Sequence, residues 1–233
     1  MGYTGYYDLN DAIMVIDAAT GAIEGAWWHT YTYPTKSINF KKGTLQMIND
    51  GELIFIVCDG TGAMLNLYKF MINGANIVSP TVLLSYVFSS PTINVRSYYS
   101  EISSDLNSIY IGGTVGWSGM IFKVKTSDFT SRWLFALKST MQGGTATHIL
   151  KLAIRYDTPN DRAYIFAGVG SLSSGCTDAT YFLVREDGSA AGGTSQTLLK
   201  TWYAVLAGSY DTQVTAAYID STFSNFYALV GAD

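Results

Sequence analysis

The sequence contains few charged residues. Asp, Glu, Lys and Arg make up 14% of its 233 residues, against about 25% in an average soluble domain. The net charge is −4, and there is no basic stripe of the kind that binds phosphate backbones, which argues against a nucleic-acid-binding protein. Nor is the chain expected to be disordered, because its hydrophobic fraction of 48% is too high for that class.

Long apolar runs and clustered cysteines are also missing. The longest apolar runs, among them residues 53–58, have six residues, whereas a membrane-spanning helix needs about 20, so no membrane span is expected. The two cysteines, Cys58 and Cys176, form no CxxC motif and no Cys/His cluster, which excludes a structural zinc site. A single disulfide between them stays open. The opening MGYTGYYDLN lacks the basic and apolar regions of a signal peptide.

Tyrosine and glycine are abundant instead. The chain has 17 Tyr and 23 Gly, a mixture that suits twisted β-sheets joined by tight turns. No segment has a sustained 3.6-residue apolar period that would indicate a helix. We therefore expect an all-β protein.

Strand–turn–strand patterns recur along the chain and indicate a repeat. Four segments each combine an alternating strand, a turn rich in Asn, Asp or Ser, and an apolar strand that usually ends in Gly; they are residues 44–60, 95–116, 149–170 and 213–233. A second kind of hairpin lies between them, at residues 12–28, 66–82, 119–135 and 180–196.

The spacing of these segments predicts a closed ring. Ile54, Tyr110, Tyr164 and Tyr227 occupy equivalent positions 54–63 residues apart, and continuing through the chain ends gives a similar step. Four units of about 58 residues thus account for the chain, which predicts a single four-bladed β-propeller domain over residues 1–233. The N-terminal outer strands would pair with the C-terminal inner strands and close the ring. The expected blades are residues 213–233 plus 1–31, 38–86, 93–137 and 147–200. The alternative is four blades cut from a larger propeller.

One segment resembles a known family. The sequence from Ile16 to Gly21, IDAATG, followed by Trp27 and Trp28, is similar to the repeat of quinoprotein-type propellers, in which an Asp-x-x-Thr-Gly turn precedes a tryptophan that docks neighbouring blades. YIGG with GMIFKVKTSDFTSRW is similar to bacterial propeller repeats. The resemblance implies the propeller fold. It carries over no quinone or calcium residues, so no cofactor is expected.

A binding site is expected where the loops of a propeller gather on one face around the channel mouth. The residues predicted there are Asp59, Trp117, Asp178, His29 and His148. Carboxylates beside an exposed tryptophan would suit a carbohydrate, although Asp also forms turns and Trp117 also fits a role in covering the next blade. Neither histidine has an HxxxH partner, so no metal site and no catalytic residue is predicted.

Three functions remain open on these grounds. The first is a non-enzymatic structural or interaction module, extracellular or surface-exposed and self-associating, because surfaces rich in Tyr, Ser, Thr and Gly and poor in charge associate with themselves or with glycans. The second is a lectin-like propeller that binds a glycan on the loop face. The third is a propeller glycosidase or lyase, which needs ionisable groups such as Asp59, Asp178 and His148 to converge.

Overall fold

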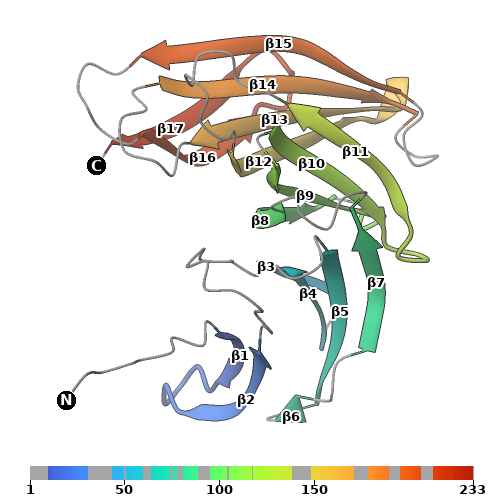
Figure 1. The fold of residues 1–233 in the computed structure, drawn as a ribbon, viewed down its shortest axis with the longest axis vertical. Helices are drawn as coiled ribbons and strands as arrows, with labels where there is room; N and C mark the ends of the chain where they lie inside the picture. The colour runs from blue at the N-terminus through green and yellow to red at the C-terminus, as the bar shows by residue number, and fades with distance from the viewer. Residues whose placement is uncertain are drawn as a thin grey trace. The chain divides into compact units, whose positions relative to one another are not determined.

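The computed structural model describes most of the chain as antiparallel β-strands (Figure 1). The described residues are 10–30, 44–49, 51–59, 64–73, 76–77, 81–88, 95–103, 105–116, 118–137, 148–170, 178–188, 195–205 and 212–232. They divide into two compact units, Met1–Thr92 and Ile93–Asp233, which we describe one at a time.

The first unit contains a hairpin and a larger sheet. The hairpin consists of β1 (Asn10–Ile16) and β2 (Ile23–Thr30). The sheet has the order β3-β4-β5-β7, and a two-residue strand, β6 (Asn76–Ile77), pairs with the end of β5. Its strands are β3 (Thr44–Asn49), β4 (Glu52–Asp59), β5 (Met64–Asn73) and β7 (Thr81–Val87). Ile13 packs with Leu53, Phe55 and Phe70 in the core of this unit.

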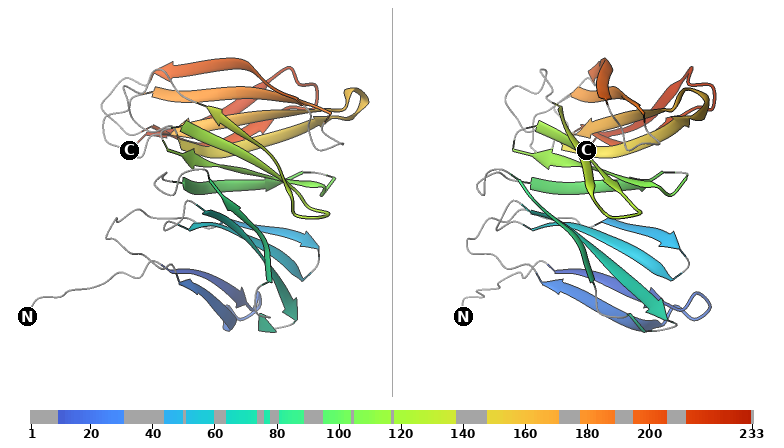
Figure 2. Two further views of the ribbon diagram at one scale, coloured as in Figure 1. Left: turned by 45° about the vertical axis from the view of Figure 1, so that its right-hand side comes forward. Right: turned by 90° about the vertical axis from the view of Figure 1, so that its right-hand side faces the viewer.

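The second unit contains two four-stranded sheets and a hairpin, which Figure 2 shows from two sides. The first sheet has the order β8-β9-β10-β11, from β8 (Val95–Ile102), β9 (Ser108–Val115), β10 (Ser118–Lys125) and β11 (Ser131–Leu137). The second has the order β12-β13-β14-β15, from β12 (His148–Asp157), β13 (Arg162–Gly170), β14 (Asp178–Asp187) and β15 (Ser195–Val205). A single 3₁₀ turn, Thr158–Asn160, joins β12 to β13. The hairpin consists of β16 (Thr212–Ile219) and β17 (Phe226–Ala232).

Aspartate side chains organise the tight turns between strands. The Asp17 carboxylate accepts hydrogen bonds from the backbone N–H groups of Ala19 and Thr20, at 2.9 and 2.6 Å. Asp128 accepts from the N–H of Thr130, and Asp220 accepts from that of Thr222. A side-chain acceptor that bonds its own backbone two or three residues on is the reason that Asp favours such turns.

The strand pairs share a recurrent irregularity. The first strands of the four pairs predicted above are β3, β8, β12 and β16. Each contains one residue that is left out of the register with its partner strand. The register also shifts in the pairs β1–β2, β5–β7, β10–β11 and β14–β15. The residues that follow the shift are Ile16, Tyr68, Val124 and Val184. A bulge at this spacing increases the local twist of each sheet.

The predicted all-β fold is confirmed, while the predicted ring remains a prediction. Ile54, Tyr110, Tyr164 and Tyr227 each lie in the second strand of an antiparallel pair, β4, β9, β13 and β17. The hairpin expected within residues 66–82 is present as the short β5–β6 pair, and β7 supplies a longer pairing of β5 that was not predicted. Among the described strands no sheet closes on itself, and the single-domain interpretation likewise stays a prediction.

Candidate functional site

The five residues predicted to bind a ligand lie at strand ends or outside the described residues. Asp59 is the last residue of β4 and His29 lies near the end of β2, both in the first unit. His148 and Asp178 begin β12 and β14 in the second unit. Trp117 lies outside the described residues, as do the side chains of the other four.

The backbone brings two of these positions to one end of one sheet. His148 pairs with Gly170, the last residue of β13, and Asp178 pairs with Val205, the last residue of β15. Alternate strands of an antiparallel sheet run in the same direction, so β12 and β14 begin at the same end. Whether the side chains of His148 and Asp178 meet there stays a prediction.

A different group of polar side chains converges inside the second unit. In the sheet β8–β11, Glu101 pairs with Tyr110, Tyr110 with Lys123, and Lys123 with Trp133 across successive strands. Residues directly opposite each other on neighbouring strands point to the same face. The four side chains therefore form one polar and aromatic row across the sheet.

A second row faces the first from the sheet β12–β15. Tyr156 pairs with Ala163, and Ala163 pairs with Glu186 across β12, β13 and β14. The hydroxyls of Tyr156 and Tyr110 lie 2.8 Å apart and share a hydrogen bond. The two rows thus meet between the two sheets, next to a core that contains Ile121, Ile165, Phe182 and Val184.

Glu186 is the centre of this buried polar cluster. Its Oε1 accepts hydrogen bonds from Lys123 Nζ at 2.6 Å and from Trp133 Nε1 at 2.8 Å. Its Oε2 accepts from the Tyr110 hydroxyl at 2.7 Å. Lys123 Nζ also lies 5.2 Å from the centre of the Tyr110 ring, within reach of a cation–π contact. Each carboxylate oxygen therefore has a donor, as a buried charge requires.

Burial controls the protonation of the groups around Glu186. Desolvation lowers the pKa of Lys123, against the opposing effect of the Glu186 carboxylate. Desolvation also raises the pKa of Tyr110 far above its usual range, and the charges of Tyr156 and Glu186 add to this rise. Both tyrosine hydroxyls of the cluster hence remain protonated at neutral pH.

Glu101 extends the row to the edge strand β8, and its pKa is raised, as that of Tyr110 is. Burial raises the pKa of its carboxyl to about 7, although a hydrogen bond from the backbone N–H of Ile154 lowers it. At neutral pH this group is accordingly divided between its protonated and ionised forms.

The cluster is suited to joining sheets and not to acting on an external substrate. The side chains of Lys123 and Glu186 are 0% exposed, so no substrate reaches the ion pair. Its four hydrogen-bonding members other than Glu186 come from β9, β10, β11 and β12, and Glu186 comes from β14. Within the described part of the chain, no group of His, Cys, Asp or Glu is arranged to hold a metal ion.

Sequence reasoning missed this cluster, although the sequence contains a signal for it. Lys123 interrupts the apolar strand GMIFKVK, at a position that alternation places on the same face as Ile121. A lysine on a core face needs an anionic partner. The partner Glu186 is 63 positions away, and nothing in the sequence identifies it among the acidic residues.

Comparisons with known proteins leave the family open. No model of a known protein family matches the sequence, and no curated protein matches it either. Among the described residues, no helix has the length and apolar character needed to cross a bilayer.

Proposed function

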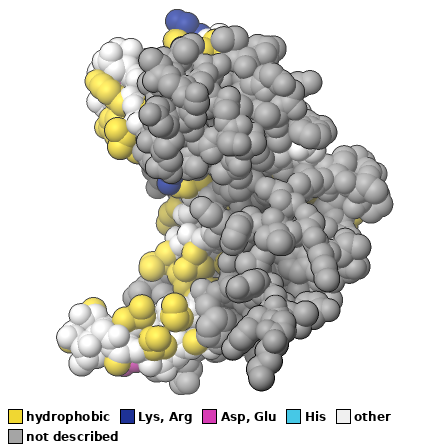
Figure 3. Space-filling view, turned by 60° about the vertical axis from the view of Figure 1, so that its left-hand side comes forward, with side chains coloured by type: hydrophobic (Ala, Val, Ile, Leu, Met, Phe, Trp, Pro, Cys, Tyr) yellow, Lys and Arg dark blue, Asp and Glu magenta, His cyan; other side chains and the backbone are white. Residues whose placement is uncertain are grey.

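We propose that the chain is a non-enzymatic structural or interaction module that associates with itself at an extracellular or cell surface. The observation that carries this proposal is the apolar character of its exposed strands. Large hydrophobic side chains are exposed on the outer strands β7, β11 and β15, among them Val82, Val87 and Leu199. Figure 3 shows hydrophobic side chains of described residues on the molecular surface. Extended apolar surfaces of this kind typically mark interaction sites.

We propose further that the fold is a four-bladed propeller closed by β17 and β1. Residues at equivalent positions of the strand pairs differ in how exposed their side chains are. Val124 and Val184 follow the shift in β10 and β14 and are 0% exposed, whereas Ile16 follows it in β1 and is 56% exposed. Tyr110 in β9 is likewise 0% exposed, whereas Tyr227 in β17 is 54% exposed.

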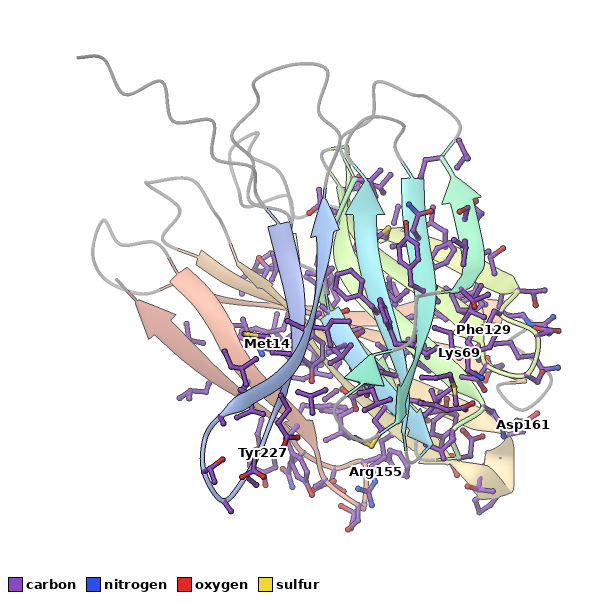
Figure 4. All side chains as sticks on the ribbon, turned by 90° about the horizontal axis from the view of Figure 1, so that it is seen from below. Met14, Lys69, Phe129, Arg155, Asp161 and Tyr227 are labelled. Carbon is purple, nitrogen blue, oxygen red and sulfur yellow. The ribbon has the colours of Figure 1, made fainter. Side chains whose placement is uncertain are left out.

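Pairing between β17 and β1 would cover these side chains. In both complete sheets of the second unit, the second and third strands are each paired on two sides and buried along most of their length. The strands β17 and β1 occupy the second and third positions of the predicted fourth blade. Figure 4 shows the side chains of Tyr227 and Met14 on these two strands. Burial of such apolar side chains contributes about 1.5–3 kcal/mol each.

Charged substitutions on these strands test the closed ring. Ile16→Asp and Tyr227→Asp would each lower the free energy of unfolding by about 3 kcal/mol if the strands pair, because each buries an unpaired charge. Leu198→Asp on β15, which is 43% exposed, serves as the matched control and should change stability by less than about 0.5 kcal/mol. Urea denaturation measures all three. Equal, small effects at the three positions would contradict ring closure.

The native mass tests self-association. Light scattering across a concentration series, with negative-stain images of the same sample, should show oligomers or filaments whose mass grows with concentration. A monomer near 25.4 kDa at every concentration would contradict the proposal.

A glycan-binding module is the second candidate, and the shared sheet end of His148 and Asp178 favours it. If this candidate holds, binding on a glycan array should be lost in Asp178→Asn and retained in Asp157→Asn. Asp157 is a suitable control because it ends β12 and so lies at the opposite end of the same sheet. Absence of binding by the wild type would exclude the glycan candidate and leave the structural proposal intact.

A further inference from the structure

The outer strands of the three four-stranded sheets differ in how well charge protects their edges. β11 contains Arg132, whose Nη2 lies 3.4 Å from Asp128 Oδ2. β15 contains the exposed Lys200 at the middle of its eleven residues. β7, with the sequence TVLLSYV, contains no ionisable side chain other than a tyrosine. Charged side chains are the usual means by which edge strands resist pairing with another chain, so β7 is the least protected of the three.

The geometry of β7 fits addition of a further strand. Among the described strands it pairs only with β5, which leaves its other side as an edge of the sheet. Val82 and Val87, near its two ends, are 54% and 61% exposed. Seven residues of high β-propensity without proline or charge match the composition of segments that pair with copies of themselves.

We infer that β7 pairs in antiparallel fashion with β7 of a second copy, which joins two sheets into one. This inference rests on the proposed self-association and specifies its surface. When a strand pairs with its own copy in antiparallel fashion, a residue at the centre of the strand lies opposite the same residue of the copy, and like charges at that position are destabilising. Antiparallel self-pairing of β15 would bring two Lys200 side chains together at its centre, whereas self-pairing of β7 brings no charges together.

The expected association is weak. One pair of seven-residue strands is at the small end of protein interfaces, whose standard size is about 1,600 Å². The backbone hydrogen bonds of the new strand pair supply the affinity, and the exposed valines contribute apolar contacts. The oligomer should therefore dissociate on dilution.

Hydrogen exchange on the wild-type protein tests the inference directly. Backbone amides of residues 81–87 should exchange more slowly at high than at low protein concentration, because pairing converts exposed N–H groups into hydrogen-bonded ones. Peptides from β11 and β15 should exchange equally at both concentrations. Concentration-dependent protection of β11 or β15 without protection of β7 would overturn the inference.

Charged substitutions provide the second test. The double variant Val82→Lys, Val87→Lys should raise the concentration needed for association at least tenfold, and Leu134→Lys on β11 and Leu198→Lys on β15 should leave it unchanged. All four positions are exposed, so the melting temperatures should stay close to that of the wild type.

The outcomes separate this inference from the proposal on which it rests. A wild-type monomer at all concentrations contradicts self-association itself. If the wild type associates and the double variant associates equally well, the module self-associates through another surface and β7 is not the site. If the double variant melts at a lower temperature, hydrogen exchange of residues 81–87 in the wild type determines whether β7 is the site of association.

Discussion

The middle strands of the second unit and the strands of the two terminal hairpins have similar residues in different surroundings. β9 reads SIYIGGTV and is buried over seven of its eight residues. β17 reads FYALVGA, and its Tyr227 and Leu229 are 54% and 63% exposed. Both strands have the aromatic and aliphatic composition of a buried sheet. The difference shows that composition predicts which strands need to be covered, while burial depends on which neighbours supply the cover.

Loss of one partner from the buried polar cluster should have the largest effect on stability. It tests how strongly the middle strands of the second unit depend on the neighbours that cover them. Glu186→Ala leaves the Lys123 ammonium without its carboxylate in the interior, and we expect it to lower the free energy of unfolding by about 3–5 kcal/mol. Arg132→Ala breaks the partly exposed ion pair with Asp128 on the same sheet and should change stability much less. Urea denaturation measures both.

The double variant Lys123→Met, Glu186→Leu is the control for this prediction. Replacing both members of a buried ion pair by apolar side chains removes the desolvation penalty with the attraction, so the double variant should be more stable than Glu186→Ala alone. A double variant as unstable as Glu186→Ala would show that the cost comes from altered packing and not from an unpaired charge.

Glu101 provides a pH-dependent test of the same buried row. Its carboxyl has a pKa raised from 4.5 to about 7 by burial, so the folded state holds this proton more tightly than the unfolded state. The resulting stability is fully present below about pH 4.5 and is lost as the pH rises through 7. A shift of this size corresponds to roughly 3 kcal/mol.

The measurement is the free energy of unfolding of the wild type and of Glu101→Gln between pH 4 and pH 8. The amide is neutral throughout, so the difference between the two proteins should grow in favour of the variant as the pH rises. A difference that does not change with pH would mean that Glu101 is solvated in the folded protein.

The fold was predictable from the sequence to the extent that it depends on local signals. Alternation and Asp-rich turns located the strand pairs, including those of Ile54, Tyr110, Tyr164 and Tyr227. The hairpin predicted within residues 66–82 is present as the β5–β6 pair. The longer pairing of β5 with β7 was not predicted, because the Asn-Gly sequence at residues 73–74 is a strong hairpin signal. The strand after it extends for only two residues, and β7 supplies the longer pairing.

The buried polar cluster was not predictable for a different reason. Tyr110 served only as a spacing marker, and no local pattern singles out Glu186. Their contact joins residues 76 positions apart, and it exists only because two sheets place their rows face to face. A local pattern indicates that Lys123 needs a partner, but only the tertiary arrangement determines which residue that is.

Two glycines offer the smallest and most local test of the contrast between middle strands and terminal hairpins. A β-carbon on Gly168, in the middle strand β13, would lie 2.8 Å from the β-carbon of the buried Val214. Gly168→Ala should therefore cost about 1–3 kcal/mol through overpacking. Gly21, in the β1–β2 turn, has nothing within 4 Å of such a carbon but has a φ of +72°. Gly21→Ala should cost about 1 kcal/mol through backbone strain alone.

A second substitution separates these two causes. Val214→Ala removes the two γ-carbons of Val214 that also crowd the new methyl group, while its β-carbon stays in place. The combined effect of Gly168→Ala and Val214→Ala should therefore be smaller than the sum of their separate effects. The same substitution should add independently to Gly21→Ala, because strain at a positive φ does not depend on a neighbour. Additive behaviour of the first pair would mean that β13 and β16 are not packed closely at Gly168. The contrast between the two regions would then reflect backbone conformation and not burial.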